Sequence, residues 1–136
     1  MIAQYFNGQG ILIFKLFLAA ILGFIAALDR KKYGKGAGMR TYALIAMGAC
    51  LFGIISNQYL NDQTRIAANI VSGIGFIGAG LIWQKRGNII GVTTAAGIWA
   101  TAAIGLAVAA DLWLLAIFAT LMLTLIFNIR WIMPWT

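Results

Sequence analysis

Apolar runs without charged residues recur along nearly the whole chain, and this feature constrains the fold more than any other. A bilayer core about 30 Å thick needs about 20 helical residues to cross it, and a helix satisfies its own backbone hydrogen bonds. Five segments approach that length: residues 10–28, 39–56, 66–83, 91–110 and 112–129. We therefore predict an all-α, polytopic membrane bundle of about five transmembrane helices, forming one domain over residues 1–136.

The composition excludes a soluble globular domain. Of the 136 residues, 62% are hydrophobic and only 10% are charged, so a soluble fold would have more apolar surface than it could bury. Cys50 lies inside an apolar run and is predicted to be a core residue. The fourth and fifth segments meet at Asp111 with almost no loop, which predicts a tight antiparallel hairpin.

The basic residues predict the orientation in the membrane, because Lys and Arg near span ends accumulate on the cytoplasmic side. Most of them follow the first and third segments or lie at the C-terminus, whereas Arg65 lies on the other side and Lys15 lies inside the first segment near that side. The N-terminus is therefore expected outside and the C-terminus in the cytoplasm. The formal charge of +7 is then a topology signal, and no segment is long enough to form a nucleic-acid-binding domain.

The stretch V-S-G-I-G-F-I-G-A-G contains Gly73, Gly75 and Gly78 at the spacing of a dinucleotide-binding loop. That motif requires a preceding strand and an acidic residue about 20 positions later. Here a membrane span surrounds the glycines, and no Asp or Glu occurs between Asp62 and Asp111. We therefore expect neither nucleotide binding nor any cofactor.

Winding residues 65–83 as a helix gives the glycines another use. The bulky side chains Ile70, Ile74 and Ile77 gather on one side, which we expect to face lipid. Small and partly polar residues gather on the other side, where they would let a second helix approach closely. We expect that neighbour in the same chain, with another protein as the alternative. This predicted packing face comprises Arg65, Ala68, Asn69, Ser72, Gly75, Phe76 and Ala79.

Three blocks in this order resemble the MgtC/SapB family: G-M-R-T-Y-A-L-I-A-M-G-A (38–49), R-I-A-A-N-I-V-S-G-I-G-F-I-G-A-G (65–80) and G-V-T-T-A-A-G-I-W-A-T-A-A-I-G-L (91–106). The resemblance implies a multi-pass protein of the bacterial inner membrane. It also implies a role in growth under magnesium limitation and in intracellular survival. Such proteins act by modulating other membrane proteins, including the F-type ATP synthase, rather than by carrying magnesium.

The family's motifs map onto particular positions of this chain. The acidic-basic pair at the end of the first span falls on Asp29 and Arg30, and the motif of the fourth span falls on Gly91, Thr93 and Thr94. Members often carry Arg where Gln84 and Ile90 stand, and some carry Asn and Cys where Thr93 and Ala100 stand. Many members also append a soluble ACT-like domain, which we do not expect here. Trp99, also in the fourth span, is expected to pack inside the bundle, with a ligand or partner contact as the alternative.

Catalysis has little chemistry available, because the chain has no His, one Cys and three carboxylates. No base–nucleophile pair can be assigned, so we do not expect an enzyme. Asp29 is predicted to form an ion pair with Arg40, with Arg30 as the alternative partner, in a structural role rather than in proton or cation handling. Asp62 and Asp111 could together hold Mg²⁺. Capping of the third span by Asp62 is the favoured interpretation, so no metal site is predicted.

The basic loop of residues 30–40 also contains Lys31, Lys32 and Lys35, which we expect to contact anionic lipid or, alternatively, a phosphate-bearing ligand. The predicted function is that of a regulatory inner-membrane protein that packs against itself, most simply as a dimer, and against other membrane proteins. An oligomeric ion transporter or channel, for Mg²⁺ or another cation, is the alternative. It would turn Thr93, Thr94 and Thr101 toward a pore.

Overall fold

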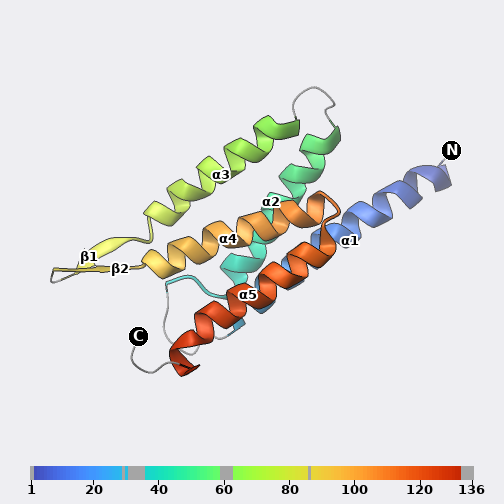
Figure 1. The fold of residues 1–136 in the computed structure, drawn as a ribbon. Helices are drawn as coiled ribbons and strands as arrows, with labels where there is room; N and C mark the ends of the chain where they lie inside the picture. Colours follow the sequence, from blue (N-terminus) through green and yellow to red (C-terminus); the bar gives the residue numbers. More distant parts are fainter. Residues whose placement is uncertain (1, 29, 31–35, 59–62, 86, 133–136) are drawn as a thin grey trace.

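The computed structural model describes residues 2–28, 30, 36–58, 63–85 and 87–132. In chain order the elements of these residues are α1 (Ile2–Ala26), α2 (Met39–Gln58), α3 (Gln63–Ala79), β1 (Trp83–Lys85), β2 (Asn88–Ile90), α4 (Val92–Ala109) and α5 (Trp113–Ile132). Figure 1 shows the helices as one bundle, with the two strands projecting from one end of it.

The predicted all-α membrane fold is confirmed. Three helical segments are long and apolar enough to cross a bilayer, namely Gly8–Ala26, Met39–Gln58 and Val92–Ala109. Two further apolar segments, Arg65–Ala79 and Trp113–Ile129, are shorter. An α-helix forms most of its backbone hydrogen bonds within itself, which is what a hydrocarbon environment requires.

Helix α2 lies between α1 and α4, and glycines allow both neighbours to approach its backbone. A Cβ added at Gly23 of α1 would lie 2.5 Å from the carbonyl oxygen of Tyr42. A Cβ added at Gly105 of α4 would lie 2.1 Å from the carbonyl oxygen of Ala46. Small residues at such contacts are how helices associate without a hydrophobic driving force.

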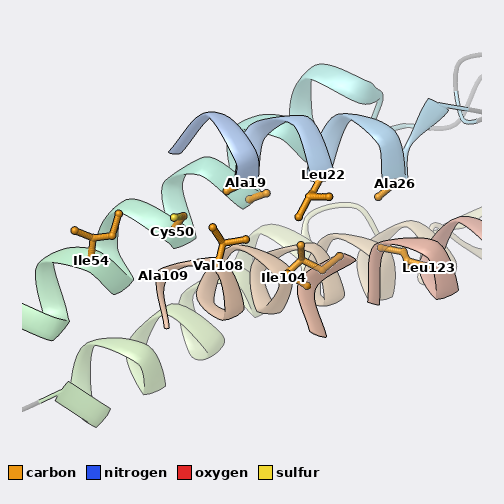
Figure 2. Packing of buried hydrophobic residues seen from close by; sticks show 11 residues of the cluster. Ala19, Leu22, Ala26, Cys50, Ile54, Ile104, Val108, Ala109 and Leu123 are labelled. Carbon is orange, nitrogen blue, oxygen red and sulfur yellow. The ribbon is translucent and has the colours of Figure 1, made fainter. Parts of the chain in front are cut away.

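The main core lies where α1, α2, α4 and α5 meet, and Figure 2 shows its side chains converging from these helices. Its members include Leu22, Cys50, Ile104 and Val108. Cys50 is 0% exposed, so its predicted place in the core is confirmed. The core thus ties the first span to the helices at the other end of the chain.

The predicted tight hairpin between α4 and α5 is also confirmed. Asp111 adopts the left-handed conformation with φ 62°, which Asp tolerates better than most residues. The Asp111 amide donates to the Val108 carbonyl at 3.2 Å, and the Leu112 amide donates to the Ala107 carbonyl at 2.9 Å. This pair of bonds is a Schellman motif, which ends α4 and reverses the chain.

The third span ends earlier than predicted. Helix α3 stops at Ala79, and Trp83, predicted to be its last residue, belongs instead to β1, where it pairs with Ile90 of β2. The two strands are antiparallel. Gly91 follows them with φ 94°, and a Cβ there would lie 1.8 Å from the Leu81 carbonyl oxygen. At Gly91 the chain returns close to Leu81. The continuous apolar sequence gives no sign of this return, so the end of the third span was predicted too late.

Candidate functional site

A buried arginine occupies the end of the bundle where α1 finishes. Arg30 follows α1 in a short turn, and its backbone amide donates to the Ala27 carbonyl at 3.1 Å. Its side chain is only 5% exposed. The guanidinium Nη2 donates to Oγ1 of Thr94 in the first turn of α4. Arg30 therefore links the end of the first span to the start of the fourth.

Two aromatic rings complete the surroundings of this guanidinium. Its central carbon lies 4.3 Å from the ring centroid of Phe127 and 5.6 Å from that of Tyr42. Both distances are within the range of a cation–π interaction. The Tyr42 hydroxyl in turn donates to the Thr94 carbonyl at 3.3 Å. We call Arg30, Tyr42, Thr94 and Phe127 the arginine centre.

Gly97 makes room for the arginine centre. A Cβ at that position would lie 2.3 Å from the Phe127 ring and 2.6 Å from the Tyr42 hydroxyl. The centre therefore depends on close packing of α2, α4 and α5 around one α4 glycine. A larger residue at position 97 would displace the rings that surround the cation.

Burial makes the cation of Arg30 costly, and the site only partly offsets that cost. Its Nε atom is buried and has no hydrogen-bond partner among the described residues. Burial lowers the pKa of Arg30, and interaction with Tyr42 raises it in part. A guanidinium nevertheless stays protonated at any physiological pH, so the centre is a fixed positive charge. Such a charge can position helices or attract an anion, but it cannot carry protons.

A second polar cluster lies at the opposite end of α4. Lys15, although it lies inside α1, is only 7% exposed. Its ammonium Nζ lies 2.8 Å from Oδ2 of Asp111 and 3.3 Å from the Ala109 carbonyl. The Asn57 amide donates to the same carbonyl at 3.2 Å. Charged groups in membrane spans generally pair in this way, and the cluster joins α1 and α2 to the turn before α5.

This pairing changes the interpretation of the acidic residues. Asp111, considered above as a possible Mg²⁺ ligand, pairs with Lys15. Asp62, its candidate partner, lies outside the described residues. Asp29 also lies outside them, so its ion pair with Arg40 stays a prediction. Arg40 itself is exposed at the start of α2, whereas Arg30 is directed into the bundle.

The small-residue face of α3 is exposed in the part of the chain that the structure describes. All seven of its residues are exposed, Phe76 to 85%, and nothing lies within 4 Å of a Cβ added at Gly75. On the opposite side of α3, Ile74 packs against the core, Gly78 approaches Ala95, and Ile70 and Ile77 line an open groove shared with α2. The expectation of a neighbour in the same chain was therefore wrong. We call the exposed face the docking face; it comprises Arg65, Ala68, Asn69, Ser72, Gly75, Phe76 and Ala79.

The predicted residues of the fourth span have different environments. Thr94 is buried in the arginine centre, whereas Thr93 is exposed and lines a recess of about 420 Å³ between the β-hairpin and the start of α4. Trp99 is 52% exposed, so the prediction that it packs inside the bundle was wrong. It lies outside the buried stripe of α4, which includes Ile98 and Thr101.

The predicted lipid-contacting lysines, Lys31, Lys32 and Lys35, lie outside the described residues. Sequence reasoning missed both the arginine centre and the Lys15–Asp111 pair. The pair could have been found, because both residues were predicted at the same membrane face and a charge inside a span needs a partner. Nothing in the sequence pattern indicated that Arg30 turns inward while its basic neighbours belong to a loop.

Comparison with known proteins identifies relatives over most of the chain. The MgtC family model matches residues 16–133. The "Putative magnesium transporter YhiD" of Escherichia coli K12 is 42% identical over 127 residues, covering 86% of this chain and 59% of the relative. "Protein SrpB" of Synechococcus elongatus is 40% identical over 123 residues, covering 79% of this chain and 68% of the relative.

"Protein MgtC" of Brucella abortus is 43% identical over 96 residues, covering 69% of this chain and 40% of the relative. The chain thus spans about three fifths of the length of YhiD and a smaller share of the Brucella MgtC protein. No solved structure matches the chain. The helical membrane architecture, the family match over residues 16–133 and these identities lead to one conclusion: the chain belongs to the MgtC family.

Proposed function

We propose that this protein regulates other membrane proteins of the bacterial inner membrane during adaptation to magnesium limitation, and that it acts by helix packing. Membership of the MgtC family and the names of its relatives support a magnesium-related role in a membrane. The partners we propose are a second copy of the chain and other inner-membrane proteins, including the F-type ATP synthase.

The observation that carries this proposal is the docking face of α3. Its small residues would allow a partner helix to approach closely, as Gly23 and Gly105 allow within the bundle. Asn69 adds an amide to the same exposed face, and a polar group is costly in hydrocarbon unless it finds a partner. A partner helix would therefore gain both close packing and a polar contact.

The competing function is cation transport, which is supported by the name of the Escherichia coli relative. A pore built by this chain would need its threonines turned inward. Thr94 instead accepts a hydrogen bond from Arg30, and the Thr101 hydroxyl donates to the Gly97 carbonyl at 2.7 Å within α4. These bonds favour a packing role for both threonines and hence the regulatory function.

Co-purification from native membranes tests the proposal. Gly75→Leu places a bulky side chain on the docking face, and Gly10→Leu is a matched control on α1, because neither added Cβ meets an atom within 4 Å. We expect Gly75→Leu to abolish association with partners and Gly10→Leu to preserve it. Equal association of both variants would refute the docking role.

Magnesium flux into proteoliposomes distinguishes the competing function. We expect vesicles that contain the purified protein to take up Mg²⁺ no faster than empty vesicles. Reproducible uptake that scales with the amount of protein would instead favour transport.

A further inference from the structure

Helices α2 and α3 face each other across an apolar groove of about 680 Å³. On each wall the lining residues recur at spacings of three and four positions along the sequence. Each wall is therefore one face of a single helix. From α2 the lining runs from Thr41 through Gly48 to Phe52, from α3 it runs from Ile66 through Gly73 to Ile77, and Ala102 of α4 also contributes. Nothing lies within 4 Å of a Cβ added at Gly48 or Gly73. The two glycines therefore leave the middle of the groove open.

The length of the groove agrees with a lipid chain as its occupant. From Thr41 to Phe52 it extends about 16 Å along α2, which is roughly half of a hydrocarbon core about 30 Å thick. One acyl chain of a phospholipid spans one leaflet, so the length of the groove is that of a single acyl chain.

The chemistry of the lining agrees with a hydrocarbon occupant. Thr41 and Asn69 are the polar side chains in the lining, and the others are aliphatic or aromatic. Thr41 lies at one end of the groove, and the exposed Arg40 precedes it. A cation at that end of a membrane groove attracts an anionic headgroup.

We propose that this groove binds one acyl chain of an anionic phospholipid, with the lipid phosphate at Arg40. The inference goes beyond the proposed function, because the groove lies on the bundle side of α3 and shares only Asn69 with the docking face. Lipid in the groove would support α3 from the side opposite its docking face.

Photo-crosslinking tests the acyl-chain site directly. The purified full chain is reconstituted with phosphatidylglycerol that carries a diazirine in one acyl chain, and labelled residues are mapped by mass spectrometry. We expect labelling to concentrate on the groove walls of α2 and α3. Gly73→Leu should reduce it several-fold, whereas Gly75→Leu, on the same helix but outside the groove, should leave it unchanged.

Labelling spread evenly over outward residues such as Leu114 of α5, which is 85% exposed, would overturn the proposal. So would labelling that Gly73→Leu leaves intact. Gly48→Leu on the opposite wall provides an independent block if Gly73→Leu does not fold. Because purified protein is used, this test can fail while partner docking survives, and the reverse also holds.

A second experiment tests the proposed contact between the lipid phosphate and Arg40. The same diazirine chain on zwitterionic phosphatidylethanolamine should label the groove more weakly than on phosphatidylglycerol, and Arg40→Gln should remove that difference. Equal labelling by both lipids in the unchanged protein would refute the phosphate contact. A protein crosslinked to a photoreactive residue at Ile70 in native membranes would show that the groove seats a partner instead.

Discussion

Replacing Gly105 by Ala should destabilise the bundle although alanine is the better helix former. The added Cβ would lie 2.1 Å from the Ala46 carbonyl oxygen and 3.0 Å from the Ala49 Cβ. Neither contact can be relieved by rotating a side chain, so α4 must move away from α2 by about 1 Å. A gap of that size forfeits a quarter to a half of the dispersion energy at each contact it opens.

We expect this separation to cost about 2–4 kcal/mol. The higher helix propensity of alanine returns about 1 kcal/mol, which leaves a net loss of about 1–3 kcal/mol in the free energy of unfolding. Gly75→Ala is the matched control, because its Cβ meets nothing within 4 Å. It should have the opposite effect and stabilise the protein by up to about 1 kcal/mol.

The assay is reversible unfolding in mixed micelles with increasing SDS, followed by circular dichroism. Opposite signs for the two variants would confirm that α4 packs closely on α2 while Gly75 of α3 has open space beside it. Equal changes in the free energy of unfolding would refute the assignment of Gly105 to a helix contact.

Three further predictions concern single polar or aromatic groups. Thr94→Val removes the acceptor for the Arg30 guanidinium and should lower the free energy of unfolding by about 1–3 kcal/mol; Thr94→Ser should restore it, and a Val variant as stable as the parent would contradict the contact. A double-mutant cycle with Lys15→Met and Asp111→Asn should give a coupling of only about 1 kcal/mol, because the aspartate side chain is 64% exposed; strict additivity would refute the pair. A variant that retains Trp99 alone among the tryptophans should be quenched by brominated acyl chains, since Trp99 is 52% exposed, and unquenched fluorescence would place it inside the bundle.

The sequence was sufficient to predict the helices and the turn between α4 and α5. Charge-free apolar runs have few structural options in a membrane, and Asp111 left no room for a loop. The short β-hairpin was not predictable in this way. Its position depends on the approach of Gly91 to the Leu81 carbonyl, a contact that no periodicity indicates.

Which side of a span faces the bundle was harder to predict. In a membrane the lipid is as apolar as isoleucine, so hydrophobicity could not distinguish the two sides of α3. Small residues then suggested burial, but Gly75 is exposed and Ile74 packs inward. For the same reason Trp99 was predicted to lie inside the bundle, whereas it is exposed. The pair of Lys15 and Asp111 was missed although both residues were expected near the same membrane face, because 96 positions separate them in the sequence.

The most direct test of the regulatory account is site-specific photo-crosslinking in native membranes. A photoreactive residue replaces Ala68 on the docking face, and Leu114 on α5 is the control. The account predicts a discrete protein adduct from position 68, none from position 114, and loss of the adduct when Gly75→Leu is added. Adducts of equal yield from both positions, or an adduct that survives Gly75→Leu, would contradict docking through α3.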